Sequence, residues 1–451
     1  MKKLTLVIFL LFLISACSSL VDKGDKLFES GEFTEAANFY ERALERDPDN
    51  VEARLGLNRA RFKIIDRGLI EVRMMRLSSN YTAAAEKLEQ ILRNQMQWNV
   101  QLDSAIASTQ TEETRHATNW LIREAGNIAQ DIQYPDRFRW LKHNYAQLIS
   151  NGRIESAMDK HRDVIWQRGQ EKCKNLTQSA DGQRFYLAEF SYLYCRSWGE
   201  DVGLKTDRQD KSRYSKLSTM GNTELKYSAE KYRSTIQREI EALTERFDQS
   251  PWFSPRGLGT LFVSTDSVLS YQHRTSYENR RASYTEEKTE TVQKSDGEQV
   301  SKTIKSVRYY PYRAKVHRET VEYFFRYTSV IDDKGLTKET SGNKYRNSEE
   351  HNESFPPAKL SPTGPDLLDV DGILQNEISA LNDAYFAELN QRWEEKYCPK
   401  AANDNTGEYV LRCAETTPND ASVDRWFQQN FGLDRSQFIS LYGIGEISEL
   451  N

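Results

Sequence analysis

The stretch GDKLFESGEFTEAANFYERALERDPDN, residues 24–50, predicts two helices joined by a tight turn. Gly31 suits the turn, because glycine adopts left-handed backbone angles at little cost. The small side chain of Ala36 would let the two helices approach closely, and Pro48 would end the second helix. Three larger or apolar residues recur at helical spacing and therefore share the face that meets a partner helix: Phe33, Tyr40 and Ala43.

The same stretch resembles a tetratricopeptide (TPR) repeat. The resemblance is carried by Gly24, Gly31, Phe33, Ala36, Tyr40, Ala43 and Pro48. It implies a TPR-like stack of helical hairpins, which we place at residues 21–165, with a concave groove that holds another protein. The pattern returns at Tyr81, later than the family period of about 34 residues allows, so the first helix of the second unit should be longer by about four turns. A fainter third copy uses Gly152, Ile154, Ala157 and Val164.

Residues 1–16 have the basic start and the short apolar core of a secretory signal, and the core is too short to span a bilayer. LISAC, residues 13–17, resembles the lipobox of bacterial lipoproteins. The resemblance implies that Cys17 becomes the first residue and carries acyl chains, so that residues 17–20 form a lipidated anchor to the membrane. Ser18, where an Asp would favour the inner membrane, suggests the periplasmic face of the outer membrane. An ordinary signal peptide, cut elsewhere, is the alternative.

Four further cysteines remain, an even number in an exported chain: Cys173, Cys195, Cys398 and Cys413. This pattern favours two local disulfides, Cys173–Cys195 and Cys398–Cys413, although four cysteines allow three connectivities. The spacings match no zinc-site pattern. The formal net charge of −5 excludes wholesale binding to nucleic acid or to anionic lipid.

The remaining chain divides by pattern into a helical region at 166–250, a β-rich domain at 251–345, a polar, proline-rich linker at 346–365 and a helical C-terminal region at 366–451. In the helical region, an apolar series predicts either a helix packed on its own domain or a coiled-coil seam: Tyr232, Ile236, Ile240, Leu243 and Phe247. The fold class expected is therefore α+β, with an antiparallel middle domain.

One hairpin of the β-rich domain should protrude. Along one of its strands, every second residue is expected to face the core of the domain: Val321, Tyr323, Phe325 and Tyr327. Asp296-Gly297 is a favoured two-residue turn, and pairing about it sets Thr291 opposite Lys302. Both faces of the outer part are polar, which predicts a β-arm.

Basic and aromatic residues mix along this hairpin and suggest a ligand surface: Arg308, Tyr312, Arg313 and Lys315. In the expected compartment, the ligand would be a glycan, such as the cell wall or lipopolysaccharide, or an acidic protein surface. The competing interpretation is an ordinary sheet, with its aromatic side chains in the core and its basic side chains in solvent.

No sequence motif of catalysis is present: we find no HExxH, GxSxG or P-loop pattern, and the six histidines are scattered. DVDG at residues 369–372 is similar to a calcium loop, but Leu367 occupies the first ligand position. We therefore expect no metal or cofactor, and a non-enzymatic scaffold or adaptor that binds a protein partner in an envelope assembly, secretion or surface-appendage system. The alternative is a peptidoglycan- or glycan-binding envelope protein, either a binding protein alone or a hydrolase that uses a dyad of distant carboxylates.

Overall fold

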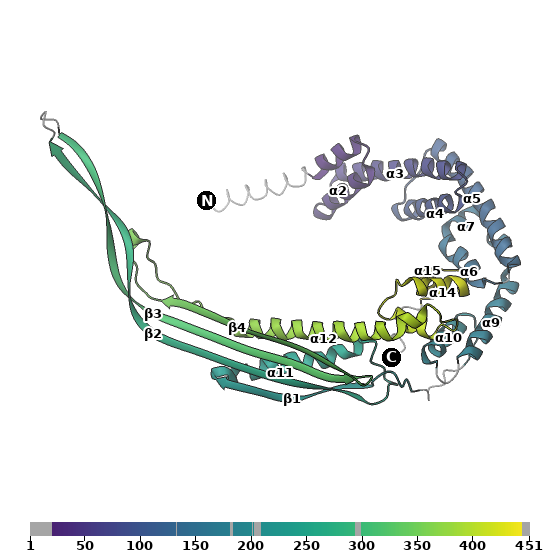
Figure 1. Ribbon diagram of the computed structural model, residues 1–451. Coiled ribbons are helices and arrows are strands. Elements are labelled where there is room, and N and C mark those ends of the chain that lie inside the picture. The colour runs from purple at the N-terminus through teal and green to yellow at the C-terminus, as the bar shows by residue number, and fades with distance from the viewer. Residues whose placement is uncertain are drawn as a thin grey trace. The chain divides into compact units, whose positions relative to one another are not determined.

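The computed structural model describes residues 20–131, 133–180, 184–200, 202, 209–293 and 299–443. The chain divides into two compact units, whose elements are labelled in Figure 1. The first unit comprises Met1–Leu204, Asn405–Gly407 and Asn419–Leu450, and the second comprises Lys205–Asp404, Glu408–Pro418 and the last residue. The chain therefore leaves the first unit and returns to it near its end. The C-terminal region at 366–451 contains helices, as expected, and these helices are shared between the two units.

The front of the first unit is a run of consecutive helices: residues 20–29, α2 (Phe33–Arg46), α3 (Val51–Leu77), α4 (Tyr81–Trp98) and α5 (Ser104–Gln130). The turn before α2 uses Gly31 at φ +84°. Asn50, Asn80 and Asp103 each cap the following helix by accepting a hydrogen bond from its first turn. With 27 residues, α3 has the extra length expected for the first helix of the second hairpin.

A buried carboxylate joins α3 to α5. The side chain of Glu113 is fully buried and accepts hydrogen bonds from Arg73 (3.1 Å) and Arg76 (2.7 Å). Burial alone would raise the pKa of Glu113, but the bonds from Arg76 and Arg73 outweigh it and hold this pKa below its usual value. The charge is therefore kept in the folded state.

The other described helices of the first unit are α6 (Pro135–Asn144), α7 (Ala146–Gly152), α8 (Glu155–Asp159), α9 (Arg162–Ser179), α10 (Phe185–Ser197), α14 (Ala421–Phe431) and α15 (Arg435–Tyr442). The faint third copy of the repeat does not form a full hairpin. Its helix ends at Asp159, so Val164 falls on the next helix and is 48% exposed, while Met158 is buried. A five-residue helix cannot carry the seven-residue spacing of the repeat.

Aromatic side chains form the core in which α10 meets the C-terminal helices. The ring of Phe190 lies 5.7 Å from Phe431 and 5.4 Å from Phe438. In the same core, the buried carboxylate of Asp136 on α6 accepts hydrogen bonds from Tyr194 (3.0 Å) and Tyr442 (2.5 Å). The C-terminal helices α14 and α15 thus complete a core whose other residues come from α6 and α10.

The second unit is built on one sheet with the order β1-β2-β3-β4: β1 (Lys216–Tyr227), β2 (Thr260–Gln293), β3 (Gln299–Ile331) and β4 (Lys334–Glu350). β1 runs parallel to β2, and the other pairs are antiparallel. One expectation is corrected here, because the sheet is mixed and not purely antiparallel. β1 also lies within residues 166–250, which are otherwise mostly helical. Only Leu217 of β1 is fully buried, so the strand shows no alternating apolar pattern.

Two helices cover one face of this sheet: α11 (Arg233–Arg246), which follows the short η1 (Ser228–Tyr232) and precedes η2 (Phe247–Gln249), and α12 (Val370–Ala401). The four alternating residues of β3 are buried as expected, and the ring of Tyr327 lies 6.0 Å from Tyr385 of α12. Ile236 and Leu243 of α11 are buried within this unit. The apolar series of α11 is thus a helix packed on its own domain. Asp369 of the DVDG motif caps α12 by accepting a hydrogen bond from Gly372.

The β2–β3 hairpin continues beyond β1 and β4 as a two-stranded arm, residues 278–293 and 299–314 (Figure 1). At about 3.3 Å per residue, the arm is roughly 50 Å long. Its register differs by one residue from the expected one: Glu290, not Thr291, lies opposite Lys302. Gln293 pairs with Gln299, so an odd number of residues connects the strands, whereas a two-residue turn would leave an even number. The expected Asp296-Gly297 turn lies outside the described residues.

The expected linker at 346–365 is ordered and partly strand. β4 extends to Glu350, so its last five residues fall in the supposed linker. The chain then forms bridges between His351 and Thr363 and between Phe355 and Leu360, around η3 (Pro356–Ala358). The ring of Phe355 stacks 4.3 Å from Tyr310 at the base of the arm. The segment contains few apolar residues, so its polar composition gave no sign of these contacts.

The β3–β4 turn and the short helix α13 (Glu408–Ala414) complete the second unit. Both turn residues, Asp332 (φ 49°) and Asp333 (φ 62°), have left-handed backbone angles. Cys398 of α12 bonds to Cys413 of α13, and in the first unit Cys173 of α9 bonds to Cys195 of α10. These are the two local pairs favoured by the sequence.

Candidate functional site

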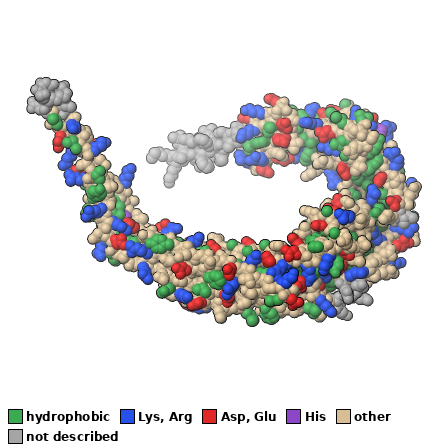
Figure 2. All heavy atoms as spheres, viewed as in Figure 1, with side chains coloured by type: hydrophobic (Ala, Val, Ile, Leu, Met, Phe, Trp, Pro, Cys, Tyr) green, Lys and Arg blue, Asp and Glu red, His purple; other side chains and the backbone are tan. Residues whose placement is uncertain are grey.

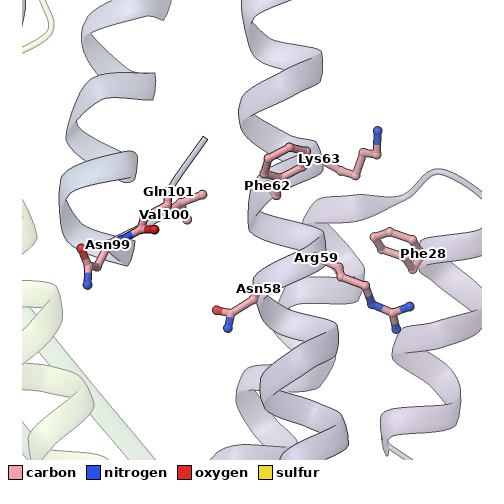
Figure 3. A pocket seen from close by; sticks show the side chains of 8 residues that line it. All are labelled: Phe28, Asn58, Arg59, Phe62, Lys63, Asn99, Val100 and Gln101. Carbon is pink, nitrogen blue, oxygen red and sulfur yellow. The ribbon is translucent and has the colours of Figure 1, made fainter. Parts of the chain in front are cut away.

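A pocket of about 500 Å³ opens on the first unit beside α3 (Figure 3). Its lining residues, which we call the groove, are Phe28, Asn58, Arg59, Phe62, Lys63, Asn99, Val100 and Gln101. One wall comes from residues 20–29 and α3, which are the first helices of two consecutive hairpins. The other wall is the segment that follows α4, and Figure 3 shows it across the pocket from α3.

The first wall is held in place by Tyr40 of α2, which is fully buried between two glycines. A Cβ atom on Gly24 would lie 2.7 Å from the Tyr40 ring, and one on Gly56 would lie 2.5 Å from it. Because neither residue has a side chain, both first helices pack directly on the ring. The Tyr40 hydroxyl donates a 2.6 Å hydrogen bond to Asp25. Burial, reinforced by this carboxylate, raises the pKa of Tyr40 above its usual value.

The two cations of the groove both have carboxylates close by. The Arg59 guanidinium lies 5.3 Å from the centre of the Phe28 ring and 3.6 Å from Asp25. Lys63 lies 3.1 Å from Asp66. Both cations are partly exposed, so the groove presents polar groups to solvent without a large excess of positive charge.

The second wall is fixed by the end of α4. Asn99 adopts left-handed angles (φ 52°) as the C-cap, and its backbone N–H bonds to carbonyls of the last turn. The Gln95 side chain then donates a 3.4 Å hydrogen bond to the Val100 carbonyl. The chain therefore turns sharply out of α4 and presents residues 99–101 to the groove.

The groove combines amide and apolar side chains. Asn58, Asn99 and Gln101 can each donate and accept hydrogen bonds, as a peptide backbone requires. Phe28 and Phe62 supply aromatic surface between them. A few polar groups placed around apolar surface are typical of binding sites. This combination suits an extended polypeptide that places an apolar side chain against Phe28 and Phe62.

A second exposed feature of α3 lies nearer its C-terminal end. Ile70, Met74 and Leu77 occupy successive turns and are 55%, 65% and 71% exposed. Large apolar side chains in a row on a helix surface are a feature of protein contacts. They form an exposed apolar row on α3.

The sequence found the residues that build the first hairpin but not those that line the groove. Ala36, Tyr40 and Ala43 are fully buried, and Phe33 packs on Phe28 with ring centres 5.2 Å apart. None of the seven TPR signature residues lines the pocket. Four of the lining residues are exposed and four are partly buried, and none belongs to the repeat signature, so the resemblance did not point to them.

The proposed ligand surface on the arm is not a set of free cations. Arg308 pairs with Glu286 (3.1 Å) and Lys315 with Glu350 (3.1 Å). The remaining two members also have partners: Arg313 lies over the Tyr277 ring at 4.7 Å, and the Tyr312 hydroxyl bonds to Glu349. Figure 2 shows basic and acidic side chains interspersed along this hairpin. These side chains thus have partners within the sheet, and the ligand surface stays a prediction.

Cys17 and residues 13–16 lie outside the described residues, so the lipobox is not part of the structure. Within the described ranges, no helix is long and apolar enough to cross a membrane. Across the same residues, no cluster of three or more His, Cys, Asp or Glu side chains could hold a metal ion.

Comparison with known proteins gives one match. A family model described as a tetratricopeptide repeat matches residues 27–64, which cover α2 and the first half of α3. No curated protein and no solved structure matches the chain. The match supports the resemblance seen in residues 24–50, and it suggests a protein-interaction scaffold.

Proposed function

We propose that this protein is a lipoprotein of the outer membrane whose groove holds a segment of a partner protein at the periplasmic face. The partner would belong to an envelope assembly, secretion or surface-appendage system. The observation that carries the proposal is the groove itself. It is built on the first helices of two consecutive hairpins, where the TPR match lies, and it is lined by amide and aromatic side chains.

The membrane anchor follows from the resemblance of residues 13–17 to a lipobox. Helical structure begins by Leu20, so only a few residues would separate acyl chains on Cys17 from the first hairpin. Several acyl chains would hold the protein stably, whereas one binds only marginally. The groove would then be presented close to the membrane surface, and its partner would have to reach that layer.

Site-specific photo-crosslinking in cells tests the groove. A benzophenone amino acid at Asn58 should give one dominant adduct with an envelope protein, which mass spectrometry would identify. Asn38 is the matched control, because it is an exposed asparagine on α2, outside the groove. Equal adducts at both positions, or adducts only with wall glycan, would overturn the scaffold proposal.

Fractionation tests the anchor separately. The Cys17→Ala variant should lose incorporation of labelled palmitate and should leave the outer-membrane fraction. Unchanged fractionation and labelling would refute the lipid anchor, while the groove proposal would remain open to the crosslinking test.

A further inference from the structure

β1 forms one edge of the sheet in the second unit. It pairs with β2 along its whole length, from Lys216–Thr260 to Tyr227–Tyr271. Within the described chain, no strand pairs with its other side. A free edge of twelve residues offers a row of backbone donors and acceptors to another strand.

The middle of this edge lacks the charged residues and prolines that usually keep free edges from pairing. Residues 217–223 of β1, LSTMGNT, contain no charge and no proline. The opposite edge strand, β4, is densely charged: Lys334, Lys338, Glu339, Lys344, Arg346, Glu349 and Glu350. Charged side chains on an edge oppose pairing with another chain. The two edge strands of the sheet therefore differ in their density of charge, and β1 is the edge that is open to pairing.

Two large apolar side chains also stand exposed beside this edge, on the sheet face that α11 and α12 do not cover. Met220 is 62% exposed and Phe262 is 58% exposed. Phe262 lies opposite Ser218 and Met220 opposite Ser264, so the two apolar residues are diagonal neighbours across β1 and β2. A strand added to β1 would cover Met220 and bring apolar surface to Phe262.

We propose that two copies of this protein pair through their β1 edges, antiparallel, about a two-fold axis at Met220. A contact of this kind is self-complementary and closes after two copies. It sets Lys216 opposite Glu224 of the second copy, and symmetry makes this contact twice. The two Met220 side chains meet at the axis, flanked by Phe262 from each copy, and the helices of both copies stay on one side of a continuous sheet.

The charges of β1 select this register over its neighbours. An axis at Gly221 sets Lys216 opposite Lys226 twice, and like charges directly opposite one another are destabilising. An axis between the two positions would set residues from opposite faces of β1 against each other, so it gives no regular antiparallel register. Within one copy, Glu224 already lies 3.3 Å from Lys226, but both side chains are about half exposed or more. Glu224 therefore remains accessible to Lys216 of the second copy.

Disulfide crosslinking in membranes tests the pairing with the full-length protein. Residues directly opposite in an antiparallel pair have Cα atoms about 4.5–5.5 Å apart, within the range of a disulfide. Met220→Cys should therefore give a covalent dimer under mild oxidation, seen on a non-reducing gel. Tyr345→Cys is the control, because it is 60% exposed on the other edge strand. Wild-type protein controls for any crosslink through Cys17.

Charge reversal tests the register. In the Met220→Cys background, Lys216→Glu or Glu224→Lys alone places like charges opposite each other twice, and we expect roughly tenfold weaker dimerisation. The double reversal restores opposite charges and should restore the crosslink. A folded Met220→Cys protein that stays monomeric, equal crosslinking at Tyr345→Cys, or single reversals without effect would each overturn the proposal.

This pairing uses only the second unit and does not depend on the groove. A groove that captures no partner would leave the β1 dimer standing. A monomeric protein would equally leave the groove proposal untouched.

Discussion

The contact of Tyr40 with Gly24 and Gly56 gives a sharp test of how the first hairpin is held. We consider Gly56→Ala in α3, compared with Gly126→Ala in α5. Both glycines lie inside helices of 27 residues. A Cβ at position 56 would lie 2.5 Å from the buried Tyr40 ring, whereas a Cβ at position 126 would have no atom within 4 Å.

The two variants share one effect and differ in another. Alanine is favoured over glycine inside a helix by about 1 kcal/mol, so Gly126→Ala should stabilise α5 by about that amount. Gly56→Ala gains the same term but adds an overpacking cost of about 1–3 kcal/mol, because the Tyr40 ring is fully buried and cannot move freely. The free energies of local unfolding should therefore differ by about 1–3 kcal/mol between the variants.

Hydrogen exchange measured by mass spectrometry reads the two helices separately, which a global melt of a two-unit protein would not. Peptides from α3 should exchange faster in Gly56→Ala than in wild type, or at a similar rate, while peptides from α5 slow down in Gly126→Ala. The contrast corresponds to roughly 5- to 100-fold in exchange rate. Equal protection of both helices by alanine would refute the packing of α3 on Tyr40.

Three further variants test other contacts. Glu113→Gln should destabilise α3 and α5 by about 2 kcal/mol at pH 7. The folded pKa of Glu113 lies below its ordinary value, so its contribution to stability is present above the ordinary pKa and is lost as pH falls through the folded pKa. Hydrogen exchange of α3 and α5 peptides should therefore show the variant and the wild type converging at low pH, and a difference in protection that stays constant with pH would contradict this. Asp333→Gly should stabilise the second unit by about 1 kcal/mol in urea titrations, because glycine adopts φ 62° without strain, and a loss of stability would argue against the left-handed turn. Replacing Cys398 and Cys413 together by serine should cost about 3 kcal/mol, the value for closing a loop of about 15 residues, and hydrogen exchange should change in the second unit only.

Patterns carried by buried side chains were predictable from the sequence. The alternation through Val321 and Tyr327 in β3 located a core strand, because side chains of a strand alternate between faces. Local cysteine spacing gave both disulfide pairs.

The remaining features depend on information that single residues do not carry. β1 is covered by few neighbours, so only Leu217 is fully buried and no period of two appears. Phe431 and Phe438 are plainly apolar, but nothing in an apolar residue specifies which helix it will meet. Asn58 and Arg59 are exposed, and exposed positions of a helix tolerate many residue types. The sequence pattern therefore does not indicate the groove.

The return of the chain to the first unit has a consequence for how a nascent polypeptide matures. The hydrogen bond between Asp136 and Tyr442 joins residues 306 positions apart. Contacts this distant close a long loop and form late, after local helices. A chain that emerges from its N-terminus therefore exposes the aromatic face of α10, with Phe190, until the final helices arrive to cover it. For the same reason, a fragment that ends before α14 lacks part of the interior of the first unit.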